Sequence, residues 1–298
     1  MLEIRRNANR LGLTLVEILV SISVIGILLG LLLPAVHAAR ASARRVSCMN
    51  NAKQVALGLH NFEAAHARLP PGTELPPTDT LFRSWLSHTL PFIEQDAIYK
   101  NQLAAYEATA NPFNVVEHEH LATRIPAFMC LEDGRISDVT IAAESGYIVG
   151  LSSYQGNLGT DYESRDGVLF GNSLVRFRDV SDGLSNTYVF GERPPSKGFD
   201  YGWWYAGAGA GDGTLDHTLG ALETANSRFA SCGEEFRSFR AGRWDRECDA
   251  LHFWSMHSGG GHFAFLDGRV EFLSYDSAHI LLALATRSEN DTFVARGR

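Results

Sequence analysis

The sequence lacks the short motifs that mark the commonest enzyme classes. It contains no Gly-x-Ser-x-Gly elbow, which carries the nucleophilic serine in many hydrolases. Its glycine-rich stretch, residues 202–211, does not have the Gly-x-Gly-x-x-Gly spacing of a nucleotide-binding loop. Its four cysteines include no Cys-x-x-Cys pair, which argues against a zinc ribbon and a thioredoxin-type site. The sequence therefore predicts a protein that is not an enzyme.

An excess of positive charge is also missing. The formal net charge of the 298-residue chain is -8, and the first twelve residues carry +2, so the remainder carries -10. An acidic body argues against nucleic acid as a partner, because nucleic-acid-binding surfaces neutralise phosphates with Lys and Arg. A hydrophobic content of 45% with 20% charged residues is typical of a folded globular protein.

A third absence lies near the N-terminus, where no charged residue occurs between Ile18 and Val36. Residues 13–36 are long enough to cross the ~30 Å hydrocarbon core of a membrane as a helix. No Ala-x-Ala-like cleavage site follows, which argues against an ordinary signal peptide. Glu17 is the one carboxylate in this segment, and a carboxylate in lipid needs a partner.

The stretch Gly12-Leu-Thr-Leu-Val-Glu17 resembles the processing site of type IV prepilins and pseudopilins. The resemblance implies that residues 1–12 are a basic leader and that a membrane prepilin peptidase cuts between Gly12 and Leu13. It also implies N-methylation of Leu13, and it makes Glu17 the fifth residue of the mature chain. Pro34 matches the proline that kinks the membrane segment in this class.

Glu17 has a physical role in this scheme. Cleavage frees an α-amino group on Leu13, and Glu17 of a neighbouring subunit can neutralise that cation inside the membrane. The alternative, that Glu17 only reaches the lipid headgroups, suits the unassembled subunit. Gly26 and Gly30 form a GxxxG spacing that permits close approach of helices, which is a weak signal by itself.

Charge counting does not orient the span, because arginines occur on both sides of it. The resemblance implies a single-pass inner-membrane protein with a cytoplasmic N-terminus and an extracytoplasmic C-terminal domain, or a subunit of a cell-surface filament. The implied partners are prepilin peptidase, other pilin-like subunits, the pilus or secretion assembly machinery and membrane lipid.

The helix pattern continues past Pro34, so residues 37–66 are predicted to be the amphipathic half of the same long helix. Its apolar residues recur at steps of three and four, as one stripe of an amphipathic helix: Cys48, Ala52, Val55, Leu59 and Phe62. The sequence Leu69-Pro-Pro-Gly72 is a strong stop, so we expect the helix to end near His66.

Residues 67–298 form the predicted extracytoplasmic globular domain, with short strands and long loops. Short strands are expected at residues 146–150, 166–171 and 187–191. The clearest hairpin surrounds Asp267-Gly268, where both turn residues are expected to have positive φ. The predicted fold is α+β and pilin-like, with the long N-terminal helix packed on an antiparallel sheet.

Several segments, in order along the chain, resemble a large bacterial family of prepilin-leader proteins with the domain of unknown function 1559. The longest matching pieces are Cys48–Leu57, Leu90–Gln95, Asp182–Glu192 and His257–Phe272. Leu131-Glu132 and His262 depart from the family pattern, which has Pro-Ser and Asn at these positions. The family consists of pseudopilin-like proteins, and the resemblance implies no activity.

Two sets of polar residues are candidate metal ligands. Oxygen ligands that suit calcium are Asp179, Asp182 and Asn186, with Glu192 further along the chain. The same segment also has the composition of plain turns. Ligand types that suit zinc are His252, His257, His262 and Asp267. His257 precedes a Gly-Gly-Gly turn, where capping of backbone groups is the simpler role. We expect no cofactor, with calcium as the leading candidate if there is one.

Four cysteines in an exported domain predict two disulfides. Three connectivities are open. The preferred pair is Cys48 with Cys130, which joins the helix to the domain. Cys232 with Cys248 then closes a loop in the polar stretch between them.

The sequence favours a structural subunit of a type IV pilus or a type II secretion-like pseudopilus. The alternative is a membrane-tethered surface module in which Trp203, Trp204 and Tyr205 bind a glycan or a protein, although such aromatics are more often part of a core. A third hypothesis, a metallohydrolase, depends on the histidine set.

Overall fold

The structure is a computed structural model that describes residues 15–136, 140–161, 163–207, 215–223, 231–233 and 238–288. The predicted leader, with the processing residues Gly12 and Leu13, lies outside these residues. The chain divides into two compact units, residues 1–44 and residues 45–298, and each is described by itself. The longest element, helix α1 (Leu15–His66), supplies residues to both units.

The described residues of the first unit form the N-terminal part of α1. The hydroxyl groups of Ser21 and Ser23 each donate a 2.7 Å hydrogen bond to a backbone oxygen four residues earlier, on Glu17 and Leu19. Such bonds satisfy the hydroxyls within the helix, so the serines add no unsatisfied donor to the apolar run. Helix α1 continues through Pro34 without a break.

The second unit begins with the remainder of α1, which carries the apolar stripe. The predicted stripe from Cys48 to Phe62 is buried, which confirms the amphipathic pattern. Beside it, the Asn51 side chain donates hydrogen bonds to the backbone oxygens of Pro126, at 3.1 Å, and Met129, at 2.9 Å. The helix ends at His66, as the proline-rich stop predicts.

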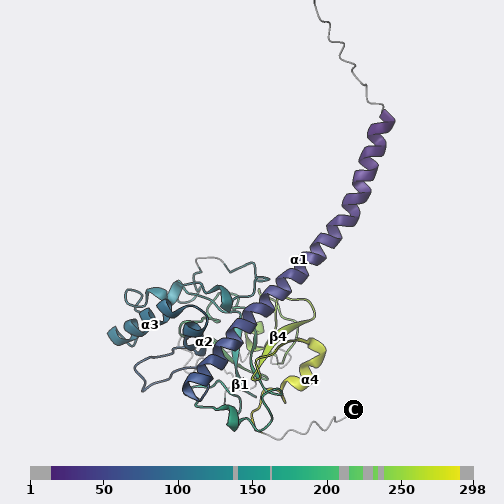
Figure 1. The fold of residues 1–298 in the computed structure, drawn as a ribbon. Coiled ribbons are helices and arrows are strands. Elements are labelled where there is room, and N and C mark those ends of the chain that lie inside the picture. Colours follow the sequence, from purple (N-terminus) through teal and green to yellow (C-terminus); the bar gives the residue numbers. More distant parts are fainter. Residues whose placement is uncertain are drawn as a thin grey trace, which may run out of the picture. The chain divides into compact units, whose positions relative to one another are not determined.

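A five-stranded sheet lies against this part of α1 (Figure 1). Its strands are β1 (Tyr154–Gly159), β2 (Tyr188–Glu192), β3 (Thr218–Gly220), β4 (Gly260–Phe265) and β5 (Val270–Ser274). The order is β3-β1-β2-β4-β5. The pairs β1–β2, β2–β4 and β4–β5 are antiparallel, whereas β1–β3 is parallel. The α+β prediction is confirmed, and the sheet is mixed because of its edge strand β3.

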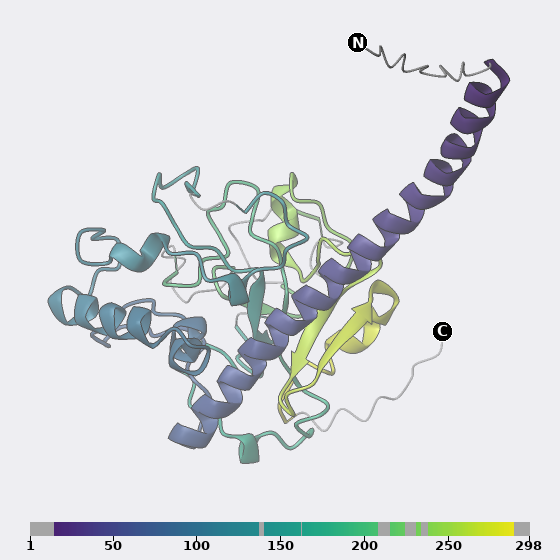
Figure 2. The ribbon, with the colours of Figure 1, turned by 45° about the horizontal axis from the view of Figure 1, so that its top comes forward.

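The β4–β5 hairpin lies beside the second half of α1 in Figure 2. Contacts support this placement, because Lys53 donates to the backbone oxygen of Gly268 and the Arg45 guanidinium lies 3.4 Å from the centre of the Phe272 ring. The hairpin occurs where it was predicted, but its turn differs. Gly268 has a φ of +85°, while Asp267 does not have a positive φ. The loop is one residue longer than a two-residue turn, because Phe265 still bonds to Arg269.

Two hydrophobic clusters pack around the sheet. One includes Ala52, Val55 and Leu59 of the α1 stripe and the rings of Trp85, Tyr154 and Phe190, and the other includes Phe253 and Phe263. Side chains of a strand alternate between the two faces of a sheet. On β4, Phe263 and Phe265 belong to the second cluster and Ala264, between them, belongs to the first.

Short helices and long loops complete the domain. The α-helices are α2 (Trp85–Thr89), α3 (Asp96–Ala108) and α4 (Ala278–Leu281). The 3-10 helices of the described residues are η1 (Leu90–Phe92), η2 (Glu119–Ala122), η3 (Pro126–Phe128), η4 (Phe177–Asp179), η7 (Glu247–Leu251) and η8 (Tyr275–Ser277). The expected strand at 187–191 matches β2, whereas 146–150 contributes one isolated bridge and 166–171 forms no strand. The segment 166–171 also contributes one isolated bridge, from Gly171 to Thr73. Val149, Val168 and Leu169 are buried without a ladder, whereas Ile148 is exposed.

Candidate functional site

The N-terminal part of α1 is the first functional region. Among the described residues, one helix is long and apolar enough to cross a membrane, and it is α1. Its large apolar side chains between Leu15 and Val36 are all exposed, from 43% at Val36 to 79% at Leu15. A soluble protein rarely leaves so large a continuous apolar surface uncovered. This segment is therefore a candidate membrane anchor.

The polar and small residues predicted to matter for assembly lie in this same segment. Glu17 is in the first turn of α1. A methyl group added to Gly26 or Gly30 would meet no atom of the described residues within 4 Å, so close packing among these residues does not explain the two glycines. Their role in subunit contact stays a prediction.

The calcium candidates form ordinary turn contacts. A carboxylate oxygen of Asp179 accepts a 3.0 Å hydrogen bond from the backbone of Arg176, which caps η4. The Asn186 side chain donates a 2.9 Å hydrogen bond to the backbone oxygen of Asp182. These contacts account for the residue types through turn formation, and calcium binding stays a prediction.

The aromatic loop does not present its rings to solvent. Trp203, Trp204 and Tyr205 are at most 1% exposed and belong to the hydrophobic cluster that includes buried residues of α1. The Trp204 indole donates a 2.7 Å hydrogen bond to the backbone oxygen of Thr123, and the Trp203 indole donates one of 2.7 Å to Phe199. The hypothesis that these rings bind a glycan is wrong for this structure, because they are core anchors.

Both disulfides have the connectivity that the sequence favoured among its three alternatives. Cys48 is bonded to Cys130, and Cys232 is bonded to Cys248. The first bond joins the helix α1 to the loop that follows η3. The second closes a loop with a sequence separation of 16 residues.

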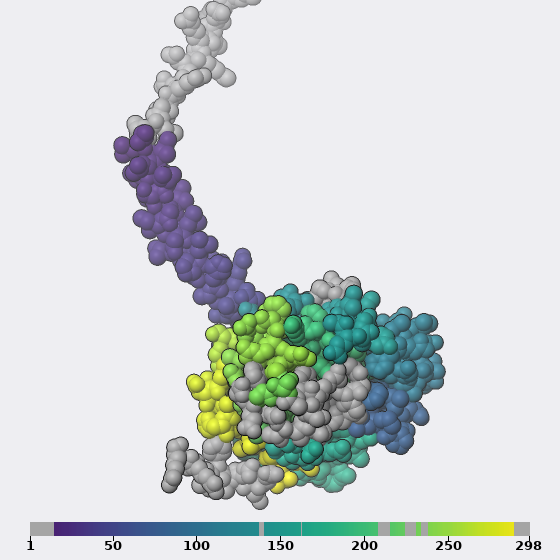
Figure 3. Space-filling model, turned by 180° about the vertical axis from the view of Figure 1, so that it is seen from behind, coloured from purple at the N-terminus to yellow at the C-terminus, as the bar shows by residue number. Residues whose placement is uncertain are grey.

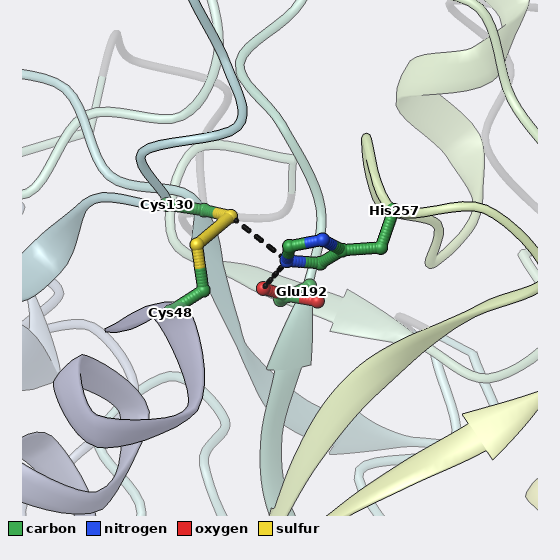
Figure 4. Close-up of side chains that lie close together, drawn as sticks. All are labelled: Cys48, Cys130, Glu192 and His257. Carbon is green, nitrogen blue, oxygen red and sulfur yellow. Dashed lines mark hydrogen bonds and ion pairs between the residues drawn. A yellow bond between two sulfur atoms is a disulfide. The ribbon is translucent and has the colours of Figure 1, made fainter. Parts of the chain in front are cut away.

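Four side chains converge at the Cys48–Cys130 bond (Figure 4). They are Cys48 of α1, Cys130 of the loop after η3, Glu192 at the end of β2 and His257 of the loop before β4. We call them the cysteine–histidine–glutamate group. Their ligand atoms all lie within 4.8 Å of one another, and all four residues are buried. Of the predicted zinc set, His257 belongs to this group.

The imidazole of His257 lies between sulfur and carboxylate. Its Nε2 is 3.2 Å from Cys130 Sγ and 3.7 Å from Glu192 Oε1. Burial lowers the pKa of His257, an effect that the nearby Glu192 carboxylate partly opposes. The imidazole is therefore neutral at neutral pH, with a lone pair that can accept a proton or bind a metal ion.

The alternation of side chains along β2 places the Glu192 carboxylate next to His257 and the disulfide. Phe190 faces the α1 side of the sheet, and Glu192, two residues later, faces the same side. Its Oε2 accepts a 2.8 Å hydrogen bond from the backbone of His262 and lies 3.1 Å from His262 Nδ1. Tyr154, which pairs with Glu192 across β1 and β2, donates a 3.3 Å hydrogen bond to the backbone oxygen of Cys48.

Two other zinc candidates, His252 and Asp267, have partners outside this group, whereas His262 contacts Glu192 and the His257 ring. His252 Nε2 is 2.9 Å from Asp249 Oδ1, and both residues are buried. Asp267 accepts a 3.0 Å hydrogen bond from the backbone of Arg269 in the hairpin turn. The zinc prediction placed the histidines in one set, and no pattern in the sequence indicated that His257 meets the cysteines. No local signal could have found this, because the four residues span positions 48 to 257.

His257 also connects the group to the surface. It lines a pocket of about 400 Å³ together with Trp244, Trp254 and Tyr275. Residues around 250 form the light-green part of the surface in Figure 3.

Two families match the chain. Residues 37–278 match the family described as protein of unknown function (DUF1559), and residues 7–33 match the prokaryotic N-terminal methylation motif. The second match covers Gly12, Leu13, Glu17 and Gly30. Proteins with this motif are structural rather than catalytic, and the motif supports a type IV pilin- or pseudopilin-like precursor. No curated protein and no solved structure matches the chain.

Proposed function

We propose, from the premise that this chain belongs to the DUF1559 family and carries a prokaryotic N-terminal methylation motif, that it is a pilin-like structural subunit. In this proposal prepilin peptidase removes residues 1–12 and Leu13 is N-methylated. Residues 13–36 anchor the subunit in the inner membrane, with the C-terminal domain extracytoplasmic. The subunits then assemble through their N-terminal helices into a type IV pilus or a type II secretion-like pseudopilus.

The observation that carries the proposal is the uncovered apolar part of α1 with a carboxylate in its first turn. Lipid covers such a surface before assembly, and other helices of the same kind cover it afterwards. The polar hydroxyls of Ser21 and Ser23 are satisfied inside the helix. A plain membrane anchor does not require a carboxylate, so Glu17 is the feature of this segment that points to a further role.

Glu17 fits an assembly role through charge pairing. Peptide cleavage after Gly12 creates a positively charged amine four residues before Glu17, at the membrane end of each subunit. Charged groups are costly in the membrane, and an ion pair between the amine of one subunit and Glu17 of the next lowers the cost of both. Such a pair sets the axial position of one subunit against its neighbour.

Mass spectrometry of the protein purified from cells that process prepilins tests the first step. We expect the mature chain to begin at N-methylated Leu13. A chain that still begins at Met1, in cells that process other prepilins, contradicts the proposal because the pairing then lacks its cation.

Three substitutions of Glu17 test the second step. Glu17→Gln keeps the size but removes the charge, Glu17→Ala removes the side chain, and Glu17→Asp keeps the charge. We expect all three to insert in the membrane, with assembly strongly reduced for Gln and Ala and partly retained for Asp. Ser21→Ala, one turn further along, is the matched control and should assemble normally. Normal incorporation of Glu17→Gln into filaments contradicts the pairing.

A further inference from the structure

We propose that the cysteine–histidine–glutamate group is a metal site in the reduced protein, where a tetrahedral Zn²⁺ ion takes the place of the disulfide. The inference concerns the domain of residues 45–298 and does not depend on assembly through the N-terminal helix. It makes the link between α1 and the rest of the domain either a disulfide or a metal–thiolate bridge.

The distances already match those of a zinc site. Zinc binds Cys sulfur at about 2.3 Å and His nitrogen or carboxylate oxygen at about 2.0–2.2 Å, so the edges of its tetrahedron are roughly 3.3–3.8 Å. In the structure the sulfur–nitrogen edge from Cys130 to His257 is 3.2 Å, and the nitrogen–oxygen edge from His257 to Glu192 is 3.7 Å. The edge between the two sulfur atoms opens when the covalent bond is broken, and the remaining ligand-atom distances are at most 4.8 Å.

An unsatisfied oxygen supports a cation at this place. Glu192 is 1% exposed, and its Oε1 has no hydrogen-bond partner in the structure. Oε1 is also the oxygen nearest to His257, whereas Oε2 is already bound by the His262 backbone. A buried carboxylate oxygen without a partner is costly, and a bound cation removes that cost.

The surrounding hydrogen bonds hold the ligands in place. The Tyr154 hydroxyl donates to the backbone oxygen of Cys48, and the backbone of Cys130 donates a 3.0 Å hydrogen bond to Ser153 Oγ. His262 fixes the orientation of Glu192 through Oε2. Such supporting contacts are a regular part of metal sites because they orient the ligands.

The site also has a route to solvent. His257 lines the pocket of about 400 Å³ that also contains Trp254 and Tyr275, so an ion can approach through this side chain.

The chemistry balances with a dithiol as the reductant. The dithiol gives two electrons and two protons to the Cys48–Cys130 bond and leaves as a cyclic disulfide. Both thiols then release their protons as Zn²⁺ binds, because the thiolate is the ligand form. Loss of the ion followed by two-electron oxidation re-forms the disulfide.

Cobalt titration of the full-length protein in detergent tests the proposal. The variant Cys232→Ser/Cys248→Ser leaves Cys48 and Cys130 as the only cysteines. The protein is reduced with a dithiol, freed of reductant without oxygen and titrated with Co²⁺, whose thiolate charge-transfer and tetrahedral bands report the ligands. We expect one Co²⁺ per reduced chain, displaced by Zn²⁺, and none in the oxidised chain.

Variants identify the two ligands that are not cysteines. We expect His257→Ala and Glu192→Gln each to weaken binding by at least about tenfold. His279→Ala and Glu271→Gln, which change exposed residues of the same types outside the group, are the matched controls and should bind like the parent.

Three results would overturn the proposal. The first is a folded, reduced chain that takes up no more cobalt than the oxidised chain. The second is undiminished binding in both His257→Ala and Glu192→Gln. The third applies if the reduced chain unfolds, as seen by circular dichroism. Zn²⁺ should then restore the circular dichroism signal of the folded chain, and failure to restore it contradicts the proposed zinc site.

Discussion

The two disulfides differ in how much they are expected to stabilise the domain. A disulfide stabilises mainly by restricting the unfolded chain, and the effect grows with the length of the loop it closes. The Cys48–Cys130 bond has a sequence separation of 82, and the Cys232–Cys248 bond one of 16. The chain-entropy relation gives about 4.5 kcal/mol for the first bond and about 3 kcal/mol for the second at 25 °C.

We therefore expect Cys48→Ala/Cys130→Ala to lower the free energy of unfolding more than Cys232→Ala/Cys248→Ala, by about 1.5 kcal/mol. Packing adds to this difference, because Cys48 is completely buried and Cys130 is 5% exposed. Alanine keeps the helix propensity at position 48 and adds no polar group to the core.

Urea unfolding of the full-length protein in detergent measures the difference. The fluorescence of Trp85, Trp203 and Trp204 reports unfolding, since all three are buried in the hydrophobic cluster that includes residues of α1. A chelator keeps metal ions from binding free thiols during the measurement. The reasoning is refuted if the Cys232→Ala/Cys248→Ala variant is as destabilised as the other, because loop length then does not control the effect.

Two further predictions concern the second unit. Burial lowers the pKa of His88 to about 4 and that of His217 to about 3, so between pH 6.5 and 4 the unfolded chain binds protons that the folded chain does not. Each histidine should therefore cost about 2 kcal/mol of stability between pH 7 and pH 5, and a urea midpoint that is flat over this range contradicts the assignment. In Gly191→Ala the added methyl group would lie 2.5 Å from the Phe263 ring, so we expect a loss of about 1–3 kcal/mol in urea unfolding. Gly134→Ala, where no atom lies within 4 Å of the added group, is the control and should stay close to the parent.

Much of the fold could be predicted because its signals are local. The spacing of the stripe from Cys48 to Phe62 and the stop at Leu69-Pro-Pro-Gly72 predicted the buried face of α1 and its end at His66. The hairpin around Gly268 was predicted in place, since alternating apolar residues and a turn glycine occur within a dozen positions. The type of its turn was not predicted, because the length of the loop depends on which residues of β4 and β5 pair.

Strands β1 and β3 escaped prediction for a physical reason. The sequence of β1, Tyr-Gln-Gly-Asn-Leu-Gly, has no alternation of apolar and polar residues, yet every residue in it is buried. The Asn157 side chain is satisfied by distant backbone groups, since it donates to the backbone oxygens of Tyr188 and Ala285. The parallel partner β3 begins about sixty residues further along the chain, and no local pattern records that pairing.

The sequence by itself determined the features of the N-terminal segment: the uncharged run from Ile18 to Val36, the carboxylate of Glu17 just before it, and Gly12 at the spacing that predicts a processing site. These features lie within some thirty consecutive residues, and their physical meaning depends on order and spacing alone. Only the tertiary structure decided that Cys48, Cys130, Glu192 and His257 meet, and that the aromatic loop is core rather than surface. Those facts depend on which face of each strand and helix is turned inward, and packing between distant parts of the chain sets that choice.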